Sequence, residues 1–134
     1  MTVEMDEQRR IAGWFDRVYA RKGDRYLRPL RAYYVFLEVL HVQSGQRLLD
    51  VACGLGRLLE AASEYELATS GVDISTTAVA EAQRRVPDAS IKIANAEDLP
   101  FGDSQFDFVT CLGSLERMLD RRRALREMSR VARD

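Results

Sequence analysis

The chain has 134 residues, of which 46% are hydrophobic and 31% charged, and its formal net charge at pH 7 is −1. This composition is typical of one globular domain with a hydrophobic core of ordinary size. A net charge near zero gives no overall attraction to nucleic acid or to an anionic membrane surface. We therefore expect no nucleic-acid partner. No apolar run approaches the ~20 residues that cross a bilayer, so we also expect no membrane span.

The amino terminus is acidic and polar and does not resemble a secretory signal. The chain has two cysteines, Cys53 and Cys111, which fits a reduced protein of the cytoplasm with both thiols free. With one histidine and no cluster of cysteine and histidine, the sequence carries no metal-site signature. We therefore expect a cytoplasmic protein without a bound metal.

Two amphipathic helical patterns, over residues 6–21 and 26–42, occupy the first third of the chain. Their aromatic and aliphatic residues recur at three and four positions, which is typical of helices that cover the flank of a sheet. From residue 45 onward, short apolar runs alternate with further helical patterns. Strands are expected over residues 47–52, 69–74, 90–94 and 106–112. Helices are expected over residues 57–65, 75–86 and 120–132. This alternation predicts an α/β fold with a doubly wound parallel sheet and right-handed crossovers.

Residues 48–57 (Leu-Leu-Asp-Val-Ala-Cys-Gly-Leu-Gly-Arg) predict a strand, a tight loop and the start of a helix. Gly54 and Gly56 allow the backbone to turn sharply or to approach a ligand closely. In the next strand, Asp73 follows at its carboxyl end, where a carboxylate can accept both hydroxyl groups of a ribose. The combination favours a nucleotide-type ligand over an ordinary turn between a strand and a helix.

A dinucleotide is a poor match, because its binding motif requires Gly or Ala at the third small position, which is Leu59 here. Asp50, at the mouth of the loop, would also repel a diphosphate. A ligand that combines a ribose with a zwitterionic end fits better, and S-adenosylmethionine has both. A nicotinamide-dependent oxidoreductase is the disfavoured alternative.

These residues resemble the motifs of class I S-adenosylmethionine-dependent methyltransferases, of the type found in ubiquinone and menaquinone biosynthesis and its small-molecule relatives. Residues 50–56 resemble the first motif and residues 71–75 (Gly-Val-Asp-Ile-Ser) the second. Residues 94–101 and 106–110 resemble the third and fourth. The resemblance covers residues 45–132 and implies a Rossmann-like sheet of strand order 3-2-1-4. It also implies methyl transfer to a small-molecule acceptor, with S-adenosylhomocysteine as product.

The resemblance further implies the residues that bind the cofactor: Asp50, Ala52, Cys53, Gly54, Gly56, Asp73, Ile74, Asn95, Ala96 and Leu112. Asp50 would orient the ammonium group of the methionine moiety, and Asp73 would accept hydrogen bonds from the ribose. Ile74 and Ala96 would contact adenine, and Asn95 would accept from its amine. Simpler alternatives stay open: a polar strand end for Asp50, a helix cap for Asp73 and a self-bonded turn for Asn95.

The resemblance gives the amino-terminal helices a second interpretation, as a lid over the cofactor, with Tyr19, Tyr26 and Arg31 as candidate contacts. Residues 1–44 are thus expected to be a helical lid or flank. Residues 45–134 are expected to be the cofactor-binding domain, incomplete at its carboxyl end. Relatives continue into further strands, so we expect a fragment of a longer protein or a short form that associates through its exposed fourth strand as a homo-oligomer.

No catalytic residue is assigned from the sequence. Many relatives have Leu-Glu-His where this chain has Leu115-Glu116-Arg117, and the missing histidine removes the obvious general base. An alternative function is therefore a cofactor-binding but inactive half-domain or accessory subunit. Arg121, Arg122, Arg123, Arg126 and Arg130 are interpreted as a solvated helix face rather than as a patch for a phosphorylated partner.

Overall fold

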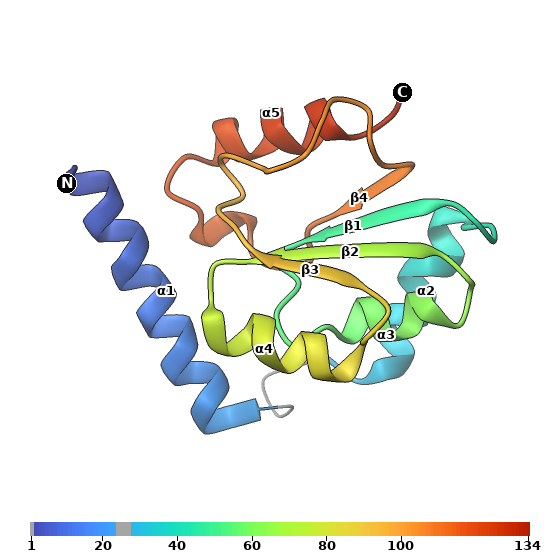
Figure 1. The fold of residues 1–134 in the computed structure, drawn as a ribbon, viewed down its shortest axis with the longest axis horizontal. Coiled ribbons are helices and arrows are strands. Elements are labelled where there is room, and N and C mark those ends of the chain that lie inside the picture. Colours follow the sequence, from blue (N-terminus) through green and yellow to red (C-terminus); the bar gives the residue numbers. More distant parts are fainter. Residues whose placement is uncertain (1, 24–27) are drawn as a thin grey trace.

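The computed structural model describes residues 2–23 and 28–134, so Tyr26, a candidate lid contact, lies outside the described residues. Along the chain the elements are α1 (Val3–Lys22), α2 (Leu30–Leu40), β1 (Arg47–Val51), α3 (Arg57–Ser63), β2 (Ala68–Asp73), α4 (Thr76–Arg85), β3 (Ser90–Ile93), β4 (Phe108–Thr110), the 3-10 turn η2 (Leu115–Arg117) and α5 (Arg121–Val131). Figure 1 shows α5 on one face of the sheet, α2, α3 and α4 on the other, and α1 beside the strand ends.

The four strands are parallel and lie in the order β3-β2-β1-β4, which confirms the predicted Rossmann-like doubly wound sheet. Asp50 of β1 is in register with Gly71 of β2. Successive residues of β1 enter opposite cores, because side chains alternate along a strand. Leu48 joins the cluster under α2, α3 and α4, whereas Leu49 joins the cluster under α5. Since both faces are covered, β1 reads as a nearly continuous apolar run.

Capping residues fix several helix ends. The Ser75 hydroxyl accepts a hydrogen bond from the Ala78 amide at 3.1 Å, as expected for the cap of α4. Thr2 caps α1 in the same way, so this helix begins earlier than predicted. The helix α2 begins only at Leu30, directly after Pro29. Asp120 accepts from the Arg123 amide and begins α5 where the sequence predicts it.

The outer edge of β4 is partly covered by the carboxyl-terminal residues. The Phe106 amide donates to the Val131 carbonyl at 3.0 Å, and the Arg133 amide donates to the Phe106 carbonyl at 2.8 Å. This parallel bridge between Phe106 and Ala132 replaces the start of the longer strand that the sequence predicts. The part of the edge along Phe108–Thr110 lies beyond the bridge.

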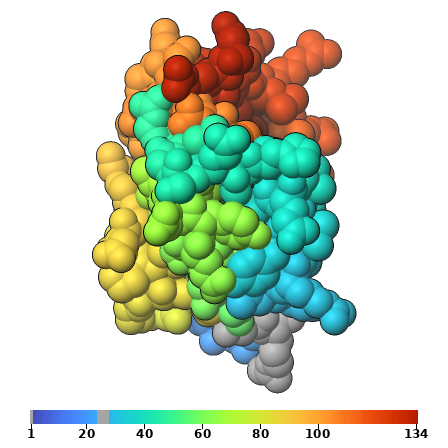
Figure 2. Space-filling model, turned by 90° about the vertical axis from the view of Figure 1, so that its right-hand side faces the viewer, coloured from blue at the N-terminus to red at the C-terminus, as the bar shows by residue number. Residues whose placement is uncertain are grey.

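The strands begin at one end of the molecule and end at the other, beside α1. Figure 2 shows the end where they begin, with the turns that lead into β1 and β2 side by side below the red carboxyl terminus. Hydrogen bonds join these turns, from the Gly45 amide to the Glu66 carbonyl at 3.0 Å and from the Ser44 hydroxyl to Glu66 Oε2 at 2.9 Å. Within the described residues, no helix combines the length and apolarity that a bilayer crossing needs.

Candidate functional site

A single carboxylate joins the carboxyl ends of β1 and β2. The Gly54 amide donates to Asp73 Oδ2 at 2.8 Å, and the Ser75 amide donates to Asp73 Oδ1 at 2.9 Å. Asp73 is buried, and burial raises its pKa against the opposing effect of these two donors. The side chain therefore faces the glycine loop. Its bond to the Ser75 amide forms a turn before α4, and the cap of that helix is Ser75 itself.

Both glycines of the loop are required by backbone conformation. Gly54 has φ 54° and Gly56 has φ 84°, in the left-handed region that side chains disfavour. A Cβ atom on Gly54 would lie 2.9 Å from the Tyr19 hydroxyl, and one on Gly56 would lie 3.0 Å from the Ala82 Cβ. Gly54 thus allows the Tyr19 side chain of α1 to approach the loop closely, whereas Gly56 allows α4 to pack closely against the loop.

Asp50 is a buried carboxyl at the end of β1. The Thr110 hydroxyl of β4 donates to its Oδ1 at 2.8 Å. The pKa of Asp50 is raised to about 7, mainly by burial and to a smaller extent by the nearby charge of Asp73, against the opposing effect of the hydrogen bond from Thr110. A cation placed beside this carboxyl would favour its ionised form, because opposite charges lower the pKa of an acid.

Two adjoining cavities lie along the strand ends. The first, here called the α1 cavity, is lined by Gln8, Ile11, Phe15, Tyr19, Ala52, Val72, Asp73, Ile74, Ala94, Asn95, Ala96, Glu97, Ser114, Arg117 and Met118. The second, here called the Asp50 cavity, measures about 330 Å³ and is lined by Tyr19, Arg28, Tyr33, Asp50, Ala52, Cys53, Gly54, Leu112, Gly113, Ser114 and Arg117. The residues common to both mark the junction. All the predicted cofactor-binding residues line one cavity or the other, except Gly56.

Of the candidate lid contacts that the structure describes, one lines the cavities and the other does not. Tyr19 lines both cavities, whereas Arg31 is exposed and lines neither. Arg28 lies in the Asp50 cavity instead, and its guanidinium passes within 2.8 Å of where a Cβ atom of Gly113 would be. The sequence analysis missed Arg28 because it placed this residue inside a helix over residues 26–42, whereas α2 begins only at Leu30 and Arg28 precedes it.

The helix α1 covers the α1 cavity and is fastened to α4 by Asp16. Asp16 Oδ1 accepts from the Ser75 hydroxyl at 2.5 Å and from the Thr77 amide at 3.1 Å. These bonds lower the pKa of Asp16 although its partial burial acts in the opposite direction. Asp16 therefore places Phe15 and Tyr19 over the strand ends.

Asn95 makes a hydrogen bond within its own turn, which is the alternative to an adenine contact that the sequence left open. Its Oδ1 accepts a hydrogen bond from the Glu97 amide at 3.0 Å. The oxygen expected to bind an adenine amine is thus engaged within the loop. Asn95 and Ala96 still line the α1 cavity.

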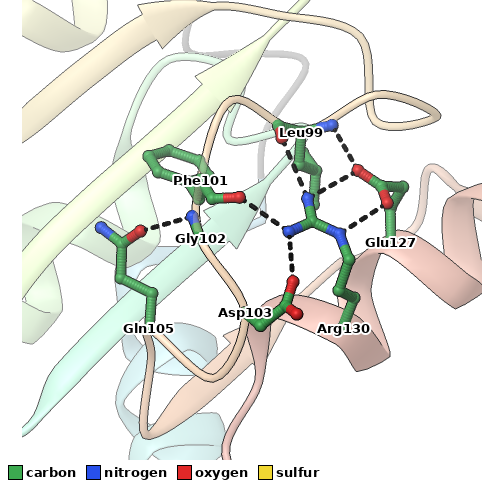
Figure 3. Close-up of polar contacts among 7 residues, drawn as sticks. All are labelled: Leu99, Phe101, Gly102, Asp103, Gln105, Glu127 and Arg130. Carbon is green, nitrogen blue, oxygen red and sulfur yellow. Dashed lines mark hydrogen bonds and ion pairs between the residues drawn. The ribbon is translucent and has the colours of Figure 1, made fainter.

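Arg130 belongs to an ordered network, and the solvated-face interpretation is wrong for this residue. As Figure 3 shows, its guanidinium donates to the Leu99 carbonyl at 3.1 Å and to the Phe101 carbonyl at 2.8 Å. It also pairs with Asp103 and, through two nitrogens, with Glu127. These contacts fasten the loop after β3 to α5, because one planar guanidinium offers five donors in a fixed arrangement. The other arginines of this set are exposed, as the sequence predicts.

The fold and the loop arrangement define a class I, Rossmann-like methyltransferase domain. Residues 49–134 match the family model described as methyltransferase domain, and the chain belongs to this family. The expected resemblance is confirmed, and with it S-adenosylmethionine as the cofactor of the family.

Individual relatives are similar over part of their length. An O-methyltransferase of Aspergillus sclerotiorum is 38% identical over 101 residues, covering 70% of this chain and 38% of that protein. A demethylmenaquinone methyltransferase of Beutenbergia cavernae is 39% identical over 102 residues, covering 72% and 40%. The crystal structure of the cyclase SpnF has a TM-score of 0.71 at 31% identity, covering 78% of this chain and 41% of that one. The chain thus spans about 40% of the length of these relatives.

Proposed function

We propose that this chain binds S-adenosylmethionine across the ends of β1 and β2, and that the protein transfers its methyl group to a small-molecule acceptor. The observation that carries the proposal is the 2.8 Å bond from the Gly54 amide to Asp73 Oδ2. It brings a glycine-lined strand end and a carboxylate together inside the region that matches the family. The carboxylate can accept hydrogen bonds from the ribose of S-adenosylmethionine, and the glycine loop leaves room for its amino-acid end.

The α1 cavity suits the adenosine part. Each Asp73 oxygen accepts one backbone amide and retains acceptor capacity for a ribose hydroxyl. Ile74 and Ala96 offer apolar contact to a flat base, and Asn95 lies at the same wall. Phe15 covers this space from α1.

The Asp50 cavity suits the methionine part, because it offers both signs of charge. Asp50 would pair with the ammonium group and Arg28 with the carboxylate. Cys53, Gly54 and Leu112 would lie along the aliphatic chain. The glycine loop thus accepts a zwitterion where a diphosphate would be repelled.

When bound, S-adenosylmethionine supplies an electrophilic methyl group on a sulfonium sulfur. The junction residues Tyr19, Ser114 and Arg117 would then surround the reacting atoms and exclude water, which favours the in-line displacement by alignment and desolvation. We assign no general base, since Arg117 stands where relatives have histidine.

Cofactor binding without methyl transfer is the second candidate. It is favoured by Arg117 at the histidine position and by the similarity to a structure named as a cyclase. Both candidates require the same cofactor site, so binding and transfer have to be measured separately.

Calorimetric titration of the protein with S-adenosylhomocysteine tests the shared site. We expect saturable heat with one ligand per chain, and the absence of heat with either S-adenosylhomocysteine or S-adenosylmethionine would refute the proposal. Binding followed by release of S-adenosylhomocysteine in the presence of acceptor would favour transfer. Binding with no turnover on any acceptor would favour the second candidate.

The wider proposal places residues 1–44 as a lid and residues 45–134 as the cofactor-binding domain of a cytoplasmic protein. Both cysteines are free thiols, which fits a reducing compartment.

The edge of β4 along Phe108–Thr110 would pair with a second copy to form a homo-oligomer. Light scattering after size exclusion tests this pairing: a dimer mass supports it, and a monomer mass at high concentration contradicts it.

A further inference from the structure

Arg117 lies where the two cavities meet, in the turn η2 between β4 and α5. Its side chain lines both cavities, and its guanidinium carbon lies 5.6 Å from the centre of the Phe15 ring of α1. A cation over an aromatic face is attracted to it, so this contact favours a position at the junction. A guanidinium in such a contact can still donate hydrogen bonds in its own plane. Arg117 is therefore placed to meet a ligand that reaches the junction.

The Asp50 cavity carries more positive than negative charge in its wall. Among the described residues that line it, the basic ones are Arg28 and Arg117, and the one carboxyl group is Asp50. The ammonium and carboxylate groups of S-adenosylmethionine add one charge of each sign, and its sulfonium adds a further positive charge. Positive charge is therefore in excess at this cavity when the cofactor is bound, which favours an anion as the second ligand.

The junction offers no side chain that would take a proton from an acceptor. The described residues that line both cavities are Tyr19, Ala52, Ser114 and Arg117, and none of them is a base near neutral pH. An arginine stays protonated, but its positive charge lowers the pKa of an acid beside it. Arg117 can therefore stabilise an acceptor oxygen that is already ionised, although it cannot remove the proton itself.

The remaining wall of the Asp50 cavity suits an aromatic group. The side chains of Tyr19 and Tyr33 are buried at this cavity, and Leu112 adds an aliphatic contact. Aromatic rings pack favourably against one another in offset or edge-to-face arrangements. The cavity thus combines a cation with aromatic walls.

We propose that the methyl acceptor binds as an aromatic oxyanion, a phenolate or a carboxylate, and that Arg117 holds its ionised oxygen at the junction. The inference rests on the proposed function, because it names the acceptor class of the same site. The oxyanion has lost its proton to solvent before it binds. An oxygen lone pair forms the bond to the methyl carbon, while the carbon–sulfur bond breaks and its electron pair stays on sulfur. Both reacting atoms are then neutral, which weakens the hold of Arg117 on the methylated product.

The test measures the binding of 4-nitrophenolate and 4-nitroaniline to protein saturated with S-adenosylhomocysteine. The two probes have similar shapes and are both coloured, and at mildly alkaline pH only the first is charged. Equilibrium dialysis with absorbance detection gives both dissociation constants. We expect wild-type protein to bind the phenolate at least about tenfold more tightly, which corresponds to the pKa shift that an adjacent opposite charge produces. Equal affinities, or no binding of either probe, would overturn the inference.

Three variants test the role of Arg117 itself. Arg117→Met keeps an unbranched side chain beside Phe15 and removes the charge, so the ratio of the two affinities should fall close to one. Arg117→Lys keeps the charge and should retain most of the preference for the phenolate. Arg126→Met is the matched control, because it removes the same charge from an exposed position of α5 that lines neither cavity. It should leave the ratio unchanged.

A full preference in Arg117→Met, or an equal loss in Arg126→Met, would contradict a local role of Arg117. Calorimetry with S-adenosylhomocysteine separates the two proposals. Wild-type protein that binds this ligand without preferring the phenolate refutes the acceptor class alone, whereas wild-type protein that does not bind it refutes the proposed function as well. If Arg117→Met does not fold, the ratio in wild-type protein decides.

Discussion

At the scale of single residues, Asp73 combines two tasks, since it holds the Gly54 and Ser75 amides and faces the α1 cavity. We predict that Asp73→Ala weakens S-adenosylhomocysteine binding by about 1–3 kcal/mol, the cost of losing a charged acceptor. Calorimetry on the folded variant measures this change. Unchanged affinity would mean that the carboxylate takes no part in binding.

Asp107 provides the control for this experiment. Its carboxylate also accepts a backbone amide, from Arg47 at 2.7 Å, but at the opposite end of β1. Asp107→Ala should therefore lower thermal stability without changing affinity for S-adenosylhomocysteine. Loss of affinity in both variants would point to general destabilisation.

Asp50 makes the stability of the protein depend on pH. Its pKa is about 7 in the fold against an ordinary value of 3.8, because burial disfavours the charge. The stability that protonated Asp50 contributes is complete below pH 3.8 and is lost as the pH rises toward 7. Asp50→Asn, which keeps an oxygen for Thr110, should escape this loss. We expect the variant to gain about 2 kcal/mol relative to wild type between pH 5 and pH 8.

Urea denaturation at the two pH values measures the difference. Comparing the variant with wild type removes the contribution of the other carboxyls, including Asp73, whose pKa is raised as well. An equal change in stability for both proteins would show that Asp50 ionises normally. The same variant should bind S-adenosylmethionine more weakly, since it lacks the charge for the ammonium group.

At the scale of elements, α1 depends on polar contacts more than on a buried face, because Tyr19 is its one residue classed as buried in the described helix. Asp16 supplies the main fastening through Ser75 and Thr77 at the start of α4. We predict that Asp16→Ala releases the helix and costs about 0.5–2 kcal/mol, as for the loss of a helix cap.

Limited trypsin digestion monitors this release, because α1 contains four arginines and one lysine: Arg9, Arg10, Arg17, Arg21 and Lys22. Cleavage within α1 should become several-fold faster in Asp16→Ala. Glu7→Ala changes an exposed carboxylate on the same helix and should leave the rate unaltered. Equal rates in all three proteins would contradict the fastening role.

At the scale of the whole molecule, stability depends on two apolar layers that share one sheet. Leu59 of α3 is fully buried, and its Cδ1 would lie 2.7 Å from a Cβ atom on Gly71 of β2. We predict that Leu59→Ala lowers the free energy of unfolding by about 2–5 kcal/mol, through lost burial and the cavity that remains.

The exposed Leu125 of α5 gives the matched comparison, since it is 50% accessible. Leu125→Ala should change the free energy of unfolding by less than about 0.5 kcal/mol. Both values come from urea denaturation with a single transition. A similar small effect at Leu59 would show that α3 does not pack as described.

Local signals predicted most of the sheet and several helix starts. Apolar runs and glycine breaks marked β1 and β2, and the hydroxyl of Ser75 marked the start of α4. The errors fall where a partner distant in sequence decides the structure. The strand β4 begins only at Phe108, since Phe106 pairs with Ala132 instead of β1, and Arg130 appears as a surface residue until the loop that it binds is known.

In the candidate site, too, some features follow from local sequence and others depend on partners distant in the chain. The sequence by itself determined the residues at the strand ends, because glycines and carboxylates at fixed positions after apolar runs have local causes. The family and the strand order followed from the resemblance of four motifs to those of known methyltransferases. Tertiary structure alone decided that α1 covers the site, that Arg28 rather than Arg31 enters it, and that the Asn95 oxygen is engaged by the Glu97 amide. Those facts depend on contacts between segments far apart in the chain, which residue patterns along a single segment do not encode.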